Sequence, residues 1–367
     1  MALYVGITIW FFFLLLLGLR PDSVQVAETW PKLPEDKKIR RNYYIVSALA
    51  LASFLFLWFL TAFRSSEIGN DTFNYMVVYK YAVLDGLDYG SVVEVGYQLL
   101  NILIGKFVKL DFHLFLIVMA ILMYGGVGVY IFKYSRNTAV SVCLFFGCFF
   151  SVFASMLRQG LAMIIVLYGY QLLKNRKRIP AAILFLLATA IHLSALVSFL
   201  LFVDLKLFQK KWFVFPLAIA CAIFSRSGLM VTLVDAIVPK YTHFFTSKYA
   251  STGWLAITYY LLFYGVIYYL ISESITEENR QDRIVALNFT LLLVFTAFGY
   301  AVNIFDRVAK YFLLIGLTEI PNMLYRGKVK HFRLWLLGIC AVTMIMFILV
   351  LIYRPGWNHL YPYEFWK

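Results

Sequence analysis

Charged residues are scarce in this sequence. Only 14% of its 367 residues are Asp, Glu, Lys or Arg, and 62% are hydrophobic, whereas soluble globular proteins carry about 25% charged residues. This composition excludes an ordinary soluble domain. The apolar residues form runs close to the roughly 20 residues that a helix needs to cross the hydrocarbon core of a bilayer. The sequence therefore predicts many membrane crossings.

Motifs for metals, disulfides and nucleotides are also missing. The four cysteines lie within apolar runs and form no CxxC pair, which favours small core residues over a disulfide framework or a zinc site. There is no DxD or HExxH motif, the five histidines are scattered, and no P-loop is present. We therefore expect no catalytic metal, no cofactor and no use of ATP.

Membrane-spanning β-strands are not expected either, because the sequence lacks the alternation of polar and apolar residues that such strands show. Uniformly apolar runs satisfy their backbone in lipid only as helices. The predicted fold class is therefore all-α, with the chain 1–367 as a single integral membrane domain. We expect a polytopic transmembrane helical bundle of roughly 10 to 12 crossings, with outer re-entrant or amphipathic segments and a GT-C-like fold as one candidate. The first run, 1–19, is expected to be a retained helix rather than a signal peptide.

The net charge of +14 comes largely from basic residues between the apolar runs. This placement indicates membrane topology, and no nucleic-acid partner is expected. By the positive-inside rule, the basic segments lie in the cytoplasm and both termini lie outside. These segments are 20–41, 133–136, 174–178 and 326–333.

The apolar runs predict where the chain crosses the membrane. Predicted crossings are 1–19, 43–63, 111–132, 139–157, 159–173, 180–203, 253–271, 284–301, 308–325 and 332–352. Segment 64–110 is expected to be an outer loop that contains an amphipathic helix near 72–81 and a shorter apolar piece at 95–108. Segment 204–252 is expected to hold two short spans or re-entrant helices, or none.

The predicted topology gathers six ionisable residues at the outer side, with the histidine inside the sixth crossing. They are Arg64, Asp71, Glu94, Arg158, His192 and Arg307. Each has an ordinary alternative role, since an arginine can snorkel to the interface, a carboxylate can be solvated in a loop, and a histidine can be hydrogen-bonded within the bundle. Ionisable residues within membranes are nevertheless functional candidates by default, and the grouping carries the hypothesis.

The residue types in this group indicate a phosphate ligand. A guanidinium offers a rigid fork of donors that matches phosphate oxygens, so Arg64, Arg158 and Arg307 are candidates for binding a pyrophosphate. A carboxylate or an imidazole beside such a clamp could act as a general base. The candidates for the base, in order, are Glu94, His192 and Asp71.

The order of these elements resembles the EpsG family of Wzy-like polysaccharide polymerases over about residues 43–325. The likeness is carried by Phe63-Arg64, Gly69-Asn70-Asp71-Thr72 with Tyr75, Glu94-Val95-Gly96-Tyr97, Leu157-Arg158-Gln159-Gly160-Leu161-Ala162, Ile191-His192-Leu193-Ser194-Ala195-Leu196, and Arg307 with Tyr311.

This resemblance implies a membrane glycosyltransferase that polymerises undecaprenyl-pyrophosphate-linked oligosaccharide units on the outer side of a bacterial plasma membrane. The product would be an O-antigen, exopolysaccharide or capsule. The resemblance adds Gln159, Tyr75, Tyr97 and Tyr311 to the arginines as substrate-binding candidates. The partners it implies are lipid-linked glycans and membrane lipid, with a chain-length regulator and a flippase as further candidates.

Two other functions remain open at this point. A flippase or transporter for lipid-linked glycans would use the same polar groups, although such proteins often show internal repeats, which we do not find here. A membrane acyltransferase could use His192 as its base, but no acyl-transfer signature accompanies that residue.

Overall fold

The computed structural model describes residues 1–23, 32, 35–88, 93–237, 253–276, 278–302, 304–326 and 328–366. Helices make up nearly all of this part of the chain, and its only β-type pairing is an isolated bridge between Arg64 and Phe365. The main elements are α1 (Ala2–Gly18), α3 (Lys37–Ala62), α4 (Thr72–Asp85), α5 (Val95–Val108), α6 (Phe112–Tyr134), α7 (Thr138–Ser155), α8 (Leu157–Lys174), α9 (Arg178–Ile191), the 3-10 helices η2 (Leu193–Phe202) and η3 (Lys206–Gln209), α10 (Lys211–Arg226), α11 (Gly228–Ile237), α13 (Trp254–Ser274), α14 (Arg280–Phe298), α15 (Ile304–Leu324) and α16 (Phe332–Tyr353).

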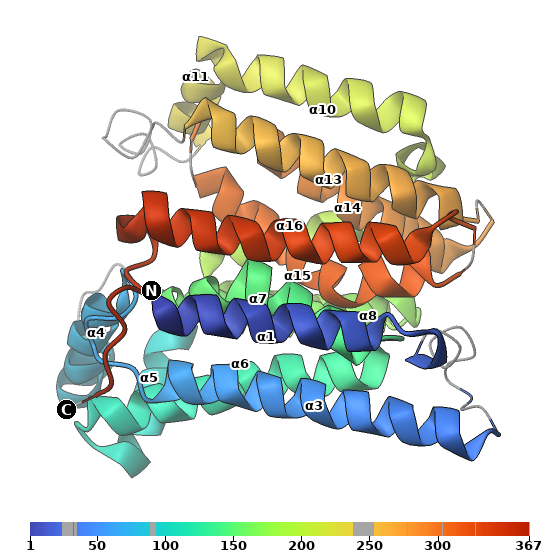
Figure 1. Cartoon of the computed structure of the whole chain (residues 1–367). Coiled ribbons are helices and arrows are strands. Elements are labelled where there is room, and N and C mark those ends of the chain that lie inside the picture. The colour runs from blue at the N-terminus through green and yellow to red at the C-terminus, as the bar shows by residue number, and fades with distance from the viewer. Residues whose placement is uncertain are drawn as a thin grey trace.

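Most of these helices lie side by side in one bundle (Figure 1). Among the described residues, six helices are long and apolar enough to cross a membrane, namely α3, α6, α7, α13, α14 and α16. The predicted all-α polytopic membrane fold is confirmed, and the chain is a multi-pass membrane protein. The predicted crossings also include the segments of α1, α8, α9 and α15, which lie in the same bundle but are shorter or less apolar.

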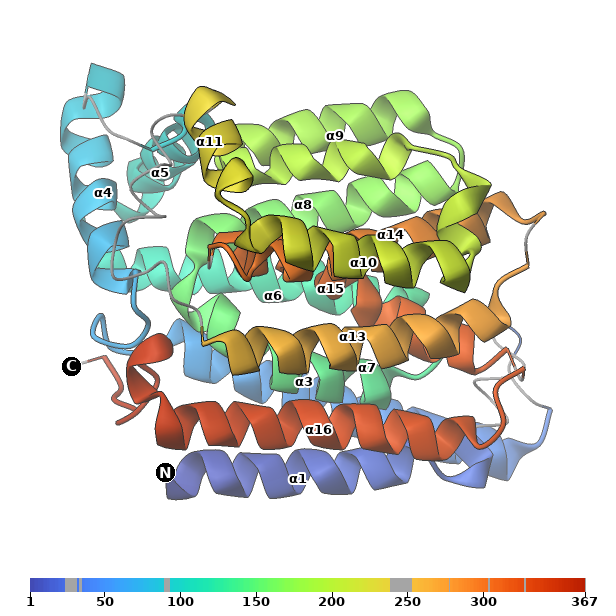
Figure 2. The same ribbon diagram turned by 90° about the horizontal axis from the view of Figure 1, so that it is seen from above.

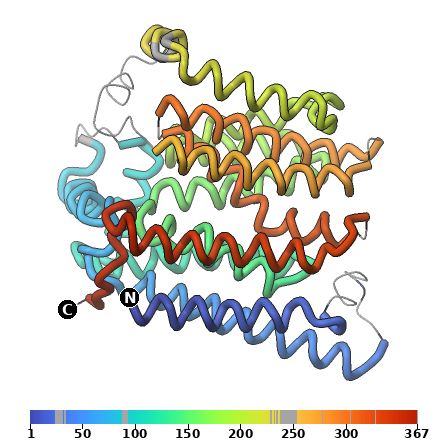
Figure 3. The backbone as a smooth tube through the Cα atoms, turned by 45° about the horizontal axis from the view of Figure 1, so that its top comes forward, coloured from blue at the N-terminus to red at the C-terminus, as the bar shows by residue number. Residues whose placement is uncertain are grey.

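The two ends of the bundle differ in charge. The described parts of the predicted basic segments lie at one end, which we call the basic end. There, for example, Asn137 donates a hydrogen bond to the carbonyl of Gly18 at 2.7 Å, and Arg326 pairs with Asp282 at 2.7 Å. Both chain termini, α4 and α5 lie at the opposite end, which we call the site end (Figures 1 and 3). Both ends of the chain thus lie opposite the described basic segments, and their location outside the membrane stays a prediction.

Short polar side chains begin several of the helices. Asp36 accepts hydrogen bonds from the backbone N–H groups of Lys38 and Ile39 at the start of α3, and Asn137 accepts one from Val140 at the start of α7. These contacts satisfy donors that have no partner within the helix. The boundaries of the long apolar helices are thus set by local sequence.

The predicted single crossing at 180–203 is wrong. Helix α9 ends at Ile191, His192 is extended with φ −152° and ψ 116°, and η2 returns beside α9 (Figure 2). Asp204, beyond η2, pairs with Arg283 at 2.6 Å at the basic end. Each arm is about 20 Å long, from 14 residues at about 1.5 Å in α9 and ten at about 2.0 Å in η2. His192 therefore lies at the tip of a hairpin and not inside a crossing.

This hairpin changes the interpretation of segment 204–252. Within it, α10 runs from the basic end along the bundle and α11 follows at the site end (Figure 2). The return of η2 supplies the additional pass, so that α10 needs no paired second span to keep the later helices in their predicted directions. The predicted apolar piece at 229–245 is described only as far as residue 237, and residues 238–252 lie outside the described residues.

Segment 64–110 contains the two helices expected from the sequence, and α4 lies across the end of the bundle (Figure 2). The turn before α4 is packed so tightly that Gly69 is required. Its φ is +92°, and a Cβ at this position would meet the carbonyl oxygen of Ala154 at 2.4 Å. The backbone N–H of Gly69 also donates to the carbonyl of His359 at 3.0 Å. This turn is thereby clamped between α7 and the C-terminal segment.

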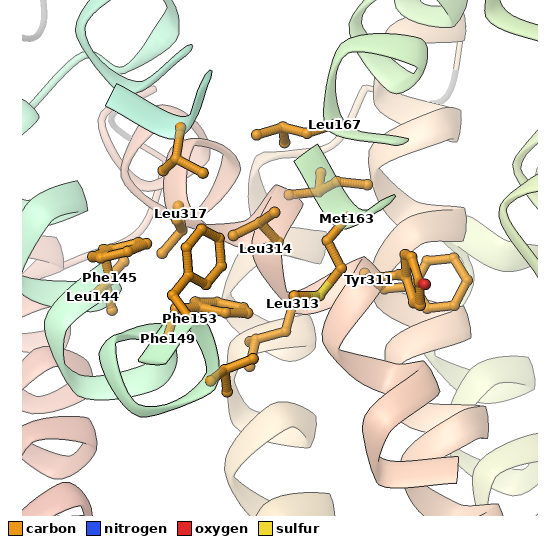
Figure 4. Packing of buried hydrophobic residues seen from close by; sticks show 14 of the residues in the cluster. Leu144, Phe145, Phe149, Phe153, Met163, Leu167, Tyr311, Leu313, Leu314 and Leu317 are labelled. Atoms are coloured by element: carbon orange, nitrogen blue, oxygen red, sulfur yellow. The ribbon is translucent and has the colours of Figure 1, made fainter. Parts of the chain in front are cut away.

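A large apolar core joins α7, α8 and α15 beneath the site end. Figure 4 shows Phe145, Phe149 and Phe153 of α7 near Leu314 and Leu317 of α15. All five side chains are buried. The helices that carry the polar residues at the site end are therefore mounted on a packed aromatic and aliphatic core.

Candidate functional site

Three of the predicted site residues meet at the site end. Nη1 of Arg158 donates a hydrogen bond to Oε2 of Glu94 at 2.7 Å. The other oxygen of this carboxylate, Oε1, lies 3.3 Å from Nδ1 of His192 and accepts a hydrogen bond from the backbone N–H of Leu193 at 3.0 Å. Glu94 thus connects a guanidinium on α8 to an imidazole at the tip of the α9–η2 hairpin. We call Glu94, Arg158 and His192 the central triad.

Local backbone structure brings the central triad together. Arg158 lies in the first turn of α8, directly after the break at Met156 that separates α8 from α7. Gly96 permits the close approach of α5 to α9, because a Cβ there would lie 2.5 Å from the carbonyl oxygen of Ala190. This contact places Glu94, at the start of α5, beside the tip of the α9–η2 hairpin. The reversal at His192 completes the group.

Two tyrosines surround the Arg158 guanidinium. It lies 5.9 Å from the ring centre of Tyr75 and 5.8 Å from that of Tyr97, and the two rings are themselves 6.0 Å apart. Such contacts stabilise a cation electrostatically and limit its rotation. Nε of Arg158 is buried and has no hydrogen-bond partner among the described residues. The guanidinium is thus held in place while part of its donor capacity is unused.

Glu94 directly precedes α5 and lies outside the long apolar helices that can cross the membrane. Burial on its own would raise the pKa of Glu94, but contact with His192, the backbone N–H of Leu193 and the charge of Arg158 together lower the pKa to about 2. A general base works best when its pKa lies near the working pH. Glu94, which is the first-ranked base in the sequence analysis, is therefore better suited to holding Arg158 and His192.

This lowered pKa predicts the acid titration of Glu94. Because the folded-state pKa lies below the ordinary value, the contacts of the carboxylate should persist as the pH falls through 4.5 and be lost only as it approaches 2. Infrared difference spectra of the protein minus Glu94→Gln should still show the Glu94 carboxylate band at pH 4. A band already half lost at pH 4.5 would contradict the assigned contacts.

Hydrogen bonds connect the triad to α15. Nε2 of Gln159 donates to the backbone carbonyl of Arg307 at 2.5 Å, and the hydroxyl groups of Ser194 and Tyr311 lie 3.1 Å apart. Gln159 and Ser194 each lie within two residues of a triad member. Gln159 and Tyr311 thus join neighbouring helices next to the triad.

Arg307 itself faces a different space. Its side chain is exposed, has no hydrogen-bonded or ion-paired partner among the described residues, and lines a cavity of about 440 Å³. Lys310 and Asp306, which also line this cavity, form an ion pair with each other. Arg307 is therefore coupled to the triad through its backbone rather than through its guanidinium.

Arg64 and Asp71 lie near the triad without contacting it. Arg64 is fully buried, its Nη1 donates to the carbonyl of Thr61, and its Nε and Nη2 have no partner among the described residues. Burial lowers the pKa of Arg64 to about 10, which leaves it charged at neutral pH. Asp71 begins α4, and its side chain makes no capping hydrogen bond. In this conformation Arg64 contacts protein groups rather than an open cavity.

The sequence analysis did not predict a role for the C-terminal segment 355–366. Its backbone pairs with the α3–α4 turn: the N–H of Ser65 donates to Glu364 at 2.9 Å, and the N–H of Trp366 donates to Phe63 at 3.0 Å. The Trp366 ring also stacks on His113 at 5.1 Å. The only signal in the sequence is a Pro-Gly turn at 355–356 followed by aromatic residues. This segment covers the turn that carries Arg64.

Metal ligation has no obvious place in the described part of the chain, where no three His, Cys, Asp or Glu side chains are grouped to hold an ion. The prediction of metal-independent chemistry is left to experiment.

Comparison with known proteins gives one match. The family model of the EpsG family matches residues 47–365, which includes the triad, the tyrosines, Arg307 and nearly all of the C-terminal segment. No curated protein and no solved structure matches the chain.

Proposed function

The chain belongs to the EpsG family, whose members are Wzy-like polysaccharide polymerases, and we propose that it polymerises lipid-linked oligosaccharide units at the central triad. The substrates would be glycans joined to a polyprenyl lipid, of the undecaprenyl type, through a diphosphate. The observation that carries the proposal is the Glu94 carboxylate, which holds a phosphate-binding type of side chain, Arg158, and a base, His192, on its two oxygens.

In the proposed reaction, the acceptor sugar's hydroxyl oxygen attacks the anomeric carbon of the donor glycan. The bond from that carbon to the diphosphate oxygen breaks, and its electron pair leaves with the lipid diphosphate. The hydroxyl proton passes to Nε2 of His192, because Nδ1 faces Oε1 of Glu94 at 3.3 Å. A carboxylate beside one imidazole nitrogen orients the ring and stabilises the imidazolium that forms. Glu94 is thus a positioning residue for His192.

Arg158 has the complementary role of stabilising the departing diphosphate. Charge-assisted hydrogen bonds from a fixed guanidinium favour the charge that develops on the leaving group. Tyr75, Tyr97 and Glu94 hold the guanidinium in a fixed position, which supports this role. Gln159, Tyr75, Tyr97 and Tyr311 position the reacting groups, and Arg64 supports the adjoining turn.

We propose that the site end faces the outside of a bacterial plasma membrane, because the basic loops favour a cytoplasmic location. In a variant without native cysteines, Glu67→Cys should react with a membrane-impermeant thiol reagent in intact spheroplasts. Lys177, at the basic end, is also exposed, and Lys177→Cys serves as the matched control, which should react only after the membrane is opened. The reverse labelling pattern would overturn the orientation.

We expect polymerisation to be independent of divalent metals, because the proposed charge stabilisation comes from arginine. Activity of the purified protein should remain within about twofold of normal in excess EDTA, whereas removal of a Lewis acid that contributes several kcal/mol would cost orders of magnitude. Loss of activity that magnesium or manganese restores would refute this prediction.

The proposed function is tested by incubating the purified protein with a lipid-linked repeat unit and separating the products by size. A ladder of glycans that differ by one repeat unit is expected. If no ladder forms and the protein instead moves the labelled lipid-linked unit across the membrane of a proteoliposome, the flippase alternative is correct.

A further inference from the structure

A second site lies away from the triad, in the cavity that Arg307 lines. Its walls come from α13 and α16, and residues of α7 and α15 complete it. At the site end it is bounded by the C-terminal segment, through Gly356, Trp357 and Asn358, and by Asn70 of the α3–α4 turn. The cavity therefore begins at the site end and lies between two membrane-spanning helices.

The lining changes in polarity along the bundle. Asp306, Arg307 and Lys310 lie in the first two turns of α15, at the site end. Farther along, Phe263 of α13 and Met346 and Phe347 of α16 form an apolar wall. Thr343 and Gly147, near the middle of α16 and α7, mark how far the cavity extends toward the centre of the membrane. One cavity thus offers a charged mouth and a deeper apolar interior.

Among the described charged side chains at the mouth of the cavity, one cation is free to bind a ligand. Lys310 is paired with Asp306, whereas the exposed Arg307 guanidinium has no partner among the described residues. A guanidinium can bind two oxygens of a phosphate or diphosphate at once. The backbone carbonyl of Arg307 is held by Gln159, which follows Arg158 in α8. The backbone of Arg307 therefore adjoins the helix that carries the triad arginine, while its side chain faces the cavity.

We propose that this cavity binds the lipid end of the acceptor substrate, which keeps its polyprenyl diphosphate during the reaction, with that diphosphate on Arg307 and the isoprenoid chain entering sideways between α13 and α16. The inference rests on the proposed function and adds a lipid subsite separate from the triad. An amphiphile with one chain and a doubly anionic head matches a mouth with one free guanidinium and an aromatic wall from Tyr259, Tyr260 and Phe263. A membrane phospholipid, with two chains and a singly charged phosphate, is the competing occupant.

The test uses geranylgeranyl diphosphate as the probe and the full-length protein in nanodiscs. Met346→Trp fills the apolar part of the cavity, and Arg307→Gln removes the cation at its mouth. Arg307→Gln should raise the dissociation constant of the probe roughly 10-fold or more, since a hydrogen bond to a charged group contributes about 1.5 to 3 kcal/mol. Met346→Trp should raise it by a similar factor, because the indole ring fills the apolar part of the cavity. Ile345→Trp is the matched control, because Ile345 neighbours Met346 on α16, is 55% exposed and does not line the cavity.

The outcomes separate the subsite from the wider proposal. A photoreactive prenyl diphosphate should crosslink to α13 or α16, and excess geranylgeranyl diphosphate, but not phosphatidylglycerol, should suppress the crosslink. Equal suppression by phosphatidylglycerol, or unchanged binding in both cavity variants, would overturn the subsite. If the cavity variants also polymerise at normal rates, only the subsite fails. If the wild type binds the probe as expected but makes no glycan ladder, only the polymerase proposal fails.

Discussion

Replacing His192 by asparagine should reduce polymerisation roughly 100-fold to 10,000-fold, the usual contribution of general acid–base catalysis. The Asn amide nitrogen can take the place of Nδ1 and donate to Glu94, but the variant has no group at the position of Nε2 to accept the acceptor's proton. The contact that organises the site is thus preserved while the base is removed. The rate of ladder formation by purified protein is the measurement.

His331→Asn is the matched control. His331 is exposed at the basic end, and its backbone has φ +53°, which asparagine tolerates well. This variant should polymerise at the normal rate. If His192→Asn also polymerises within about threefold of normal while its membrane content is unchanged, His192 is not the base.

Lysine at Arg158 should cost about 100-fold to 1000-fold in rate, as expected for loss of a donor that stabilises the transition state. The substitution keeps the positive charge but removes the planar fork that pairs with Glu94 and lies between the two tyrosine rings. Initial rates at saturating lipid-linked substrate would show whether the loss is in kcat. The same change at Arg64 and Arg307 completes the series, and lysine should fail at two or more of the three positions.

Arg333→Lys provides the control, since Arg333 is exposed at the basic end. Its activity should be normal. Arg64 is fully buried, so the thermal stability of Arg64→Lys must be measured beside its rate to separate folding from chemistry. Near-normal rates in all three lysine variants would show that the planar guanidinium is not needed at these positions and that the proposed site is wrong.

The fold class and the placement of the site follow from local sequence. Runs such as 112–134 are long enough to define a membrane helix by themselves, and the loops between them carry a charge bias that assigns each one to an end. The prediction that Glu94, Arg158 and His192 share one end depended only on the order of the crossings and on the basic loops between them. Their pairing was not predictable, because Glu94 and Arg158 are 64 residues apart and no local pattern encodes which helices touch.

Two misjudged features have identifiable physical causes. The chain reverses at His192 without Gly or Pro, inside an apolar run that continues to Val203, so hydropathy cannot distinguish a hairpin of two arms from one crossing. The C-terminal segment is held largely by backbone hydrogen bonds, such as the one from Gly69 to His359. Because such bonds do not require particular side chains, the sequence does not reveal them. The cavity at Arg307 depends on this segment and on helices far apart in the chain.

The most direct test of the central claim is to count leaving groups. Purified protein is given a lipid-linked repeat unit, and the glycosidic linkages formed and the free lipid diphosphate released are both measured. Transfer at the central triad, with a diphosphate departing toward Arg158, predicts one lipid diphosphate for each linkage, and both products should fall together in His192→Asn. Linkages formed without release of lipid diphosphate, or both products unchanged in His192→Asn, would contradict the account.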